Sequence, residues 1–86
     1  MDTYTHNPEL NRFEMLVDNH LAYVEYHIEP PYIDIIHTIV PKEIEGRGIA
    51  AQLVAATYRY GEQEHLQAKA SCSYAKVWLQ RHPSAS

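Results

Sequence analysis

The sequence predicts an α+β domain in which two helices pack on a mostly antiparallel β-sheet. Three strand-like segments follow one another between residues 12 and 40, and short turn signals separate them. The rest of the chain shows the patterns of a helix, a strand and a second helix in that order. The chain has 86 residues, of which 45% are hydrophobic, so it can bury one modest core. We therefore expect residues 1–86 to form a single domain.

The first part of the chain predicts a hairpin. Residues 1–10 are polar and indicate a tail or a short edge element. Residues 12–18 alternate between apolar and polar side chains, which is typical of a strand with one buried face. The turn signal Asp18-Asn19-His20 joins it to residues 21–29, which are rich in aromatic and β-branched residues. Pro30-Pro31 ends this second strand, because proline cannot donate to a ladder.

The middle of the chain predicts a central strand followed by a helix. Residues 32–40 hold four isoleucines and a valine, which favours a strand buried on both faces. Pro41 ends the strand, and residues 42–48 form a loop with two glycines. Residues 49–60 repeat apolar side chains at helical spacing, and Gly61 is typical of a helix stop.

The last part of the chain predicts a short strand and a helix. Residues 65–70 place alternate small and apolar side chains on one face, as a short strand does. Residues 71–81 predict a helix that Ser71 or Ser73 could cap. His82-Pro83 then ends the helix.

Composition and charge exclude several classes of protein. The net charge of −4 argues against a nucleic-acid binder that neutralises phosphates. The six histidines are scattered, with no pair four residues apart, so we expect no metal site. The single cysteine, Cys72, excludes an internal disulfide framework and fits a reducing compartment. No apolar run approaches the roughly 20 residues that span a bilayer, and no signal peptide is visible. We therefore expect a cytoplasmic protein without a membrane partner.

The stretch from Val40 to Ala50 is the most informative motif. A strand leads into a loop with Gly46 and Gly48, and the loop opens directly onto a helix. The first amides of a helix lack internal partners and attract anions, and glycines let a phosphate approach the backbone. A tight turn with two convenient glycines is the alternative. The stretch lacks the G-K-[ST] of a Walker loop and the third glycine of a Rossmann fingerprint.

The same stretch carries a family resemblance. Residues 39–54 resemble motif A of the GNAT superfamily of acyl-CoA N-acyltransferases, [RQ]-x-x-G-x-[GA] at the start of a helix after a central strand. The longer pattern H-T-I-V-P-x-x-x-x-G-R-G-I-A-x-x-L-V, followed by C-S-Y and R-H-P, is similar to short GNAT-like proteins of one minimal domain. Glu43 departs from motif A, because the wider superfamily has Arg or Gln there. This departure removes one expected contact to a phosphate.

The resemblance implies a GNAT-like sheet and a coenzyme A site. Backbone amides of the loop around Gly46-Arg47-Gly48 would hold the pyrophosphate. Lys42 and Arg47 would add local positive charge there. The backbone at the end of the central strand would pair with the pantetheine arm. Tyr74 could face the coenzyme or simply pack. The implied coenzyme-binding residues are Ile39, Val40, Lys42, Glu45, Gly46, Arg47, Gly48, Ile49 and Tyr74.

Two residues are candidates for catalysis. By strand alternation, His37 shares a face with Ile33, Ile35 and Ile39, and its imidazole could remove a proton from an amine. A hydrogen-bonded core histidine is the alternative. Cys72 lies near the predicted start of the last helix, which can lower a thiol pKa, so it could accept the acetyl group with His37 as its base. A small buried residue, or one that only contacts the coenzyme, is the alternative for Cys72.

These observations predict an N-acetyltransferase-like enzyme that uses acetyl-CoA and acts on a small amine or peptide amine. A non-catalytic acyl-CoA-binding module is a second hypothesis. A plain interaction domain, whose glycines only build a turn, is the third. We expect a monomer or weak homodimer. The sequence identifies neither the acyl acceptor nor the acyl-chain length.

Overall fold

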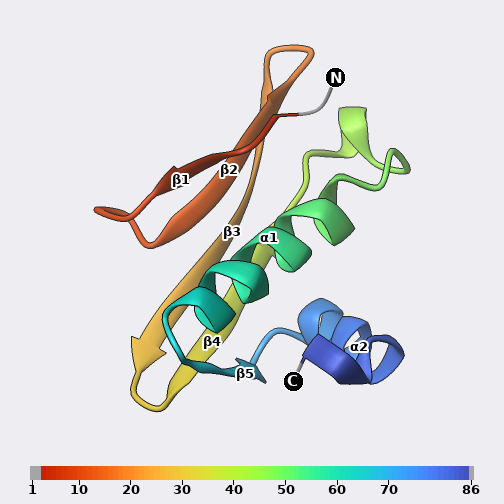
Figure 1. Cartoon of the computed structure of the whole chain (residues 1–86). Coiled ribbons are helices and arrows are strands. Elements are labelled where there is room, and N and C mark those ends of the chain that lie inside the picture. Colours follow the sequence, from red (N-terminus) through yellow and green to blue (C-terminus); the bar gives the residue numbers. More distant parts are fainter. Residues whose placement is uncertain (1–2, 86) are drawn as a thin grey trace.

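The structure is a computed structural model that describes residues 3–85. Met1, Asp2 and Ser86, the first two of which belong to the predicted tail, lie outside the described residues. The chain forms a five-stranded sheet that packs with helices α1 and α2 (Figure 1), and this confirms the predicted α+β class. The elements are β1 (Thr5–Asn7), β2 (Arg12–Val17), β3 (His20–Glu29), β4 (Tyr32–Ile39), η1 (Lys42–Ile44), α1 (Ile49–Gln63), β5 (Gln67–Ala70), α2 (Ser73–Arg81) and η2 (Pro83–Ala85).

The strands lie in the sheet in chain order, β1-β2-β3-β4-β5. The first three pairings are antiparallel, and β5 is parallel to β4. The N-terminal segment contributes an edge strand, β1. A two-residue turn joins β2 to β3, and its residues Asp18 and Asn19 have φ angles of 50° and 64°. Asp and Asn tolerate this left-handed conformation better than other side chains, which explains the tight hairpin.

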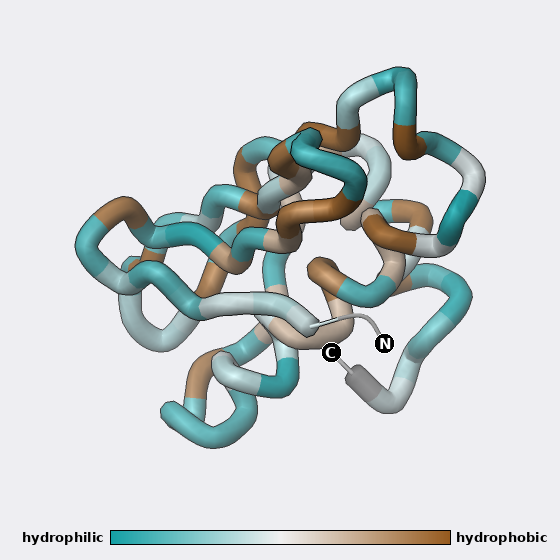
Figure 2. The backbone as a smooth tube through the Cα atoms, turned by 90° about the horizontal axis from the view of Figure 1, so that it is seen from above, coloured by the Kyte–Doolittle hydropathy of each residue, from teal (hydrophilic) through white to brown (hydrophobic). Residues whose placement is uncertain are grey.

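One face of the sheet carries the core. Helix α1 packs on β2, β3, β4 and β5, while α2 contacts β5, β4 and α1. We call the face that α1 covers the inner face and the opposite one the outer face. The fully buried side chains between sheet and helix include Val24, Ile33, Ile35, Leu53 and Val54. Hydrophobic and hydrophilic residues alternate along much of the chain in Figure 2, as expected for strands with one buried face.

The prediction that the central strand is buried on both faces is wrong. In β4, Ile33 and Ile35 are fully buried on the inner face, whereas His37 and Ile39 are exposed. Within the described residues, no helix covers the outer face. The apolar run therefore overstated how much of the strand the core encloses.

A β-bulge in β4 changes which side chains face the helix. Tyr26 of β3 pairs with Ile35, whereas the preceding residue, Glu25, pairs with His37. Ile36 is therefore an extra residue in β4 that has no partner in β3. Directly paired residues point to the same face of a sheet. His37 therefore lies on the outer face with Glu25, and the prediction that it shares a face with Ile33 and Ile35 is wrong.

Both helices differ from the prediction at one end. Gly61 does not end α1, which continues to Gln63. Its role is close packing, because a Cβ at Gly61 would lie 2.6 Å from the Cγ2 atom of Ile33. Helix α2 begins at Ser73 rather than Ser71, because the Ser71 amide and hydroxyl both donate to the Asp34 carboxylate, at 2.8 and 2.7 Å.

Candidate acyl-coenzyme site

The sheet opens beside the second half of β4. Strand β5 pairs with β4 only from Tyr32 to Ile35. The amides of Ser71 and Cys72 then both donate to the Ile35 carbonyl, at 3.0 Å, and the chain turns into α2. In the described part of the chain, the β5 side of residues 36–40 therefore has no strand partner. We call this unpaired edge the open edge of β4.

The glycine loop presents a helix N-terminus to the open edge. Gly46 and Gly48 have φ angles of 82° and 74°, which lie in the left-handed region that favours glycine. Gly48 is the N-cap of α1, and the first helical hydrogen bond runs from the Gln52 amide to the Gly48 carbonyl. The three preceding amides have no partner within the helix. No acidic residue lies in the first turn of α1, so the positive end of the helix dipole is not neutralised there.

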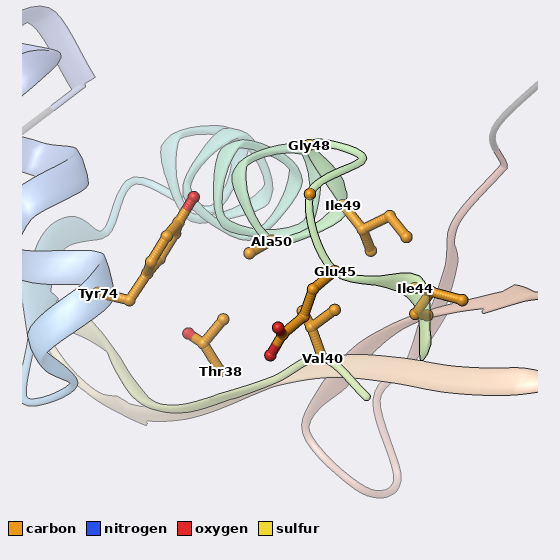
Figure 3. Close-up of a pocket in the computed structure, with 9 residues that line it drawn as sticks. Thr38, Val40, Ile44, Glu45, Gly48, Ile49, Ala50 and Tyr74 are labelled. Carbon is orange, nitrogen blue, oxygen red and sulfur yellow. The ribbon is translucent and has the colours of Figure 1, made fainter. Parts of the chain in front are cut away.

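A pocket of about 400 Å³ lies where the open edge, the loop and the two helices meet. Figure 3 shows its side chains, with Thr38 on β4, Val40 just after the end of β4, and Tyr74 projecting from α2. The structure thus brings together most of the implied coenzyme-binding residues. The full lining is Thr38, Val40, Ile44, Glu45, Gly46, Gly48, Ile49, Ala50 and Tyr74.

The remaining implied residues lie around the pocket rather than in its wall. Arg47 is exposed, and its Nη1 atom lies 2.7 Å from Oδ2 of Asp18 in the β2–β3 turn. Lys42 is exposed in η1, and Ile39 is exposed on the outer face. Glu45 extends its carboxylate into the pocket (Figure 3), where it would oppose a bound anion.

Glu43, the residue that departs from motif A, points elsewhere. Its Oε1 atom lies 3.9 Å from Nδ1 of His20, and the Glu43 side chain is 64% exposed. This carboxylate therefore belongs to the outside of the loop and does not line the pocket.

Cys72 is the N-cap of α2, next to the open edge. Its Sγ atom lies 3.4 Å from the Thr38 hydroxyl oxygen. Partial burial alone would raise the thiol pKa, but hydrogen bonds from Thr38 and from the amides of Ala75 and Tyr74 favour the thiolate, and the pKa of Cys72 is lowered. Because Thr38 and Tyr74 both line the pocket, a thiol of lowered pKa lies directly beside it.

His37 and Cys72 do not meet. His37 is exposed on the outer face and does not line the pocket. The contact that the sequence assigned to His37 is made by Thr38, the next residue along β4. Thr38 was missed because simple alternation places it on the wrong face, and nothing in the sequence marks the bulge at Ile36.

Two properties of the described residues bear on other functions. No group of three or more His, Cys, Asp or Glu side chains in that part of the chain is arranged to hold a metal ion. None of its helices has the length and apolar character that a membrane span requires.

Comparison with known proteins identifies the family. The family model of the GCN5-related N-acetyltransferases matches residues 12–86. A chain from Staphylococcus aureus with a solution structure described as GCN5-like has a TM-score of 0.76 and 30% identity, and the match covers 96% of this chain and 82% of that one.

Curated relatives match a shorter segment. Protein NATD1 from Xenopus tropicalis is 35% identical over 51 residues, which cover 59% of this chain and 47% of that protein. Protein NATD1 from Homo sapiens gives the same identity over the same length, with 45% of that protein covered. The matched segment therefore spans about half the length of these relatives. The family match and the fold lead to one conclusion: the chain belongs to the GCN5-related N-acetyltransferase family.

Proposed function

We propose that this chain binds acetyl-CoA in the pocket beside β4 and transfers the acetyl group to a small amine or a peptide amine. The observation that carries the proposal is the meeting of an unpaired strand edge and the N-terminus of α1 at one pocket of about 400 Å³. Family membership supports acetyl-CoA as the donor.

The groups around the pocket fit the parts of this donor. The amides of Gly46, Arg47, Gly48 and Ile49 can donate to a pyrophosphate. The Glu45 amide donates to the Lys42 carbonyl oxygen, at 3.3 Å, and has to leave it to join them. The open edge at Ile39 and Val40 can pair with the amide groups of a pantetheine arm as an added strand would. The Lys42 and Arg47 side chains can approach the phosphates from outside, whereas the Glu45 carboxylate has to move away from them.

The Cys72 thiol supports transfer in two steps. In the first step, the Cys72 thiolate attacks the carbonyl carbon of the thioester. A bond forms between Sγ and that carbon, the bond to the coenzyme sulfur breaks, and the coenzyme leaves as a thiolate. In the second step, an amine attacks the acetyl-cysteine, the Sγ–carbon bond breaks, and the Cys72 thiolate is restored.

The proton of the attacking amine needs an acceptor on the side from which the amine arrives. His37 can act as that base, because its imidazole is exposed on the outer face at the open edge. On this account His37 serves the second step and not the activation of Cys72. Tyr74 bounds the pocket from α2.

Titration calorimetry with acetyl-CoA, followed by an assay of coenzyme release with a panel of amines, tests the proposal. We expect binding and amine-dependent release. No heat of binding at millimolar acetyl-CoA would contradict the proposal at its first step. Binding without release for any amine would favour a non-catalytic acyl-CoA-binding module instead.

A further inference from the structure

We infer that the outer face beside His37 is the acceptor site, and that it selects a primary amine on an apolar stem whose ammonium group is received by Glu25. This inference rests on the proposed function and adds the class of acceptor to it. Its grounds are the opening of the sheet toward both faces, a carboxylate that has no ion pair among the described residues, and exposed apolar side chains nearby.

The open edge of β4 can be reached from the inner face and from the outer face of the sheet. Thr38, Cys72 and the pocket lie on the inner side, where the donor would bind. No helix covers the outer side in the part of the chain that the structure describes. A second substrate can therefore reach the same strand edge from the outer face without displacing the donor.

Glu25 lies on this outer face, one strand in from the open edge. It pairs directly with His37 across β3 and β4, so their side chains lie on the same face, about 5 Å apart at Cβ. Its other neighbour, Arg12 of β2, is engaged elsewhere: the guanidinium lies 3.9 Å from the centre of the Tyr23 ring and 3.7 Å from the Glu14 carboxylate. Within the described residues, Glu25 forms no ion pair, and a half-buried carboxylate beside an imidazole complements an incoming ammonium.

Exposed apolar side chains flank Tyr23 farther along the outer face, and we call them the apolar strip; the Arg12 guanidinium lies over the Tyr23 ring itself. Tyr23 pairs with Ile39, and Leu21 pairs with Leu16. Ile39, Leu21 and Leu16 are 43%, 42% and 66% exposed, so a hydrocarbon stem could cover them. Charge at one end and apolar surface beyond it fit an amphipathic monoamine. A diamine of the same length would place its second charge beside exposed hydrocarbon and the Arg12 guanidinium, whose Glu14 partner is already engaged, and this is unfavourable.

Steady-state kinetics with propylamine, hexylamine and 1,6-diaminohexane test the inference on the full chain at saturating acetyl-CoA. We expect kcat/KM for hexylamine to exceed that for each of the other two by about tenfold, the size expected for a few methylenes on a partly open apolar surface. A preference for the diamine would overturn the apolar part of the inference.

Two variants assign the effect to residues. Glu25→Gln should raise KM for each amine by about tenfold, as expected for the loss of a charge-assisted hydrogen bond, with kcat largely retained. Glu29→Gln, on the same strand and the same face, is the matched control and should change neither. Leu21→Ser should remove the preference for hexylamine, whereas Leu10→Ser, also exposed but outside the strip, should keep it.

Calorimetry with acetyl-CoA separates failure of this inference from failure of the proposed function. Absence of binding to the wild-type chain would contradict both. If binding and turnover are normal but Glu25→Gln behaves like Glu29→Gln, the acceptor site is wrong and the proposed function stands. Binding without turnover of all three amines also overturns the acceptor site. A dimer that Leu21→Ser converts to a monomer in sedimentation would assign the face to a second copy instead.

Discussion

The two sides of β4 differ more than their sequence suggests. On the inner side, Thr38 and Val40 line a pocket that also contains the N-terminus of α1 and lies beside Cys72. On the outer side, His37 and Ile39 are exposed and face no helix within the described residues. A single extra residue, Ile36, sets this division, because it moves every later side chain of β4 to the opposite face.

Under the proposed function, one strand serves two substrates because a bulge lies at the sheet opening. The inner side offers backbone amides and a thiol of lowered pKa, which suit a thioester and its phosphates. The outer side offers an imidazole and a carboxylate, which suit a cationic amine. We therefore expect substitutions on the two sides to separate donor binding from acceptor use.

The largest effect is expected at the inner side from Gly48→Val. Gly48 has a φ of 74°, which a β-branched residue adopts at a cost, and the new side chain would lie beside the helix amides. Acetyl-CoA binding should weaken by about 100-fold or more in calorimetry, as expected when an anion site at a helix N-terminus is lost. Gln63→Val, at the other end of α1, is the control. Unchanged binding in Gly48→Val would remove the loop from the donor site.

Gly61→Ala tests whether the close contact between α1 and the inner face stabilises the fold. The added Cβ would lie 2.6 Å from Ile33 Cγ2, so the core has to shift. Urea unfolding should show a loss of about 1–3 kcal/mol in the free energy of unfolding, as is common when a packed core is overfilled. Acetyl-CoA affinity of the folded variant should stay within twofold. A variant as stable as the wild type would show that α1 does not pack so closely against Ile33.

Thr38→Val tests the contact that the bulge creates. The swap replaces a hydroxyl by a methyl group, and the hydroxyl favours the Cys72 thiolate. The pKa of Cys72 should rise, so the thiolate fraction at neutral pH should fall and the pH midpoint of acetylation by acetyl-CoA should move up. The rate at pH 7 should drop about fivefold, which corresponds to one hydrogen bond worth ~1 kcal/mol. An unchanged pH profile would separate Thr38 from the thiol.

The smallest effect is expected from Glu45→Gln, which removes a negative charge from the pocket without changing its shape. Acetyl-CoA binding should tighten by about two- to fivefold at low salt, since a solvent-exposed charge interacts with a bound anion by ~1 kcal/mol or less. The difference should shrink as salt increases. Weaker binding in this variant would mean that the Glu45 side chain contributes to donor binding.

Much of the fold follows from local patterns in the sequence. The alternation in residues 12–18, the Asp18-Asn19 turn and Pro30-Pro31 fixed the β2–β3–β4 meander to within a few residues. Two features did not follow, because tertiary packing decides them. Gly61 resembles a helix stop, yet its lack of a side chain serves contact with Ile33. Ile36 resembles an ordinary strand residue, yet the register shift makes it a bulge.

The arrangement of the candidate site was predicted in part. The loop with Gly46 and Gly48 is where the residues and the family resemblance place it, because glycines at a strand-to-helix turn leave a local signal. The contact of Thr38 with Cys72, and the separation of His37 from Cys72, depend on the strand register. No periodicity in the sequence encodes that register. Arg47 was expected to add charge to the pocket, but its ion pair with Asp18 depends on a hairpin 29 residues away in the chain.

The division of roles between the two sides of β4 is tested most directly by acetylation of the protein followed by an amine chase, monitored by intact-mass spectrometry. The wild-type chain should gain one acetyl group from acetyl-CoA and lose it when hexylamine is added. Cys72→Ala should gain none. His37→Ala should gain the acetyl group at the wild-type rate and lose it about 100-fold more slowly, the usual size of a general-base contribution. An acetyl group that appears in Cys72→Ala, or fails to appear in His37→Ala, would contradict the account.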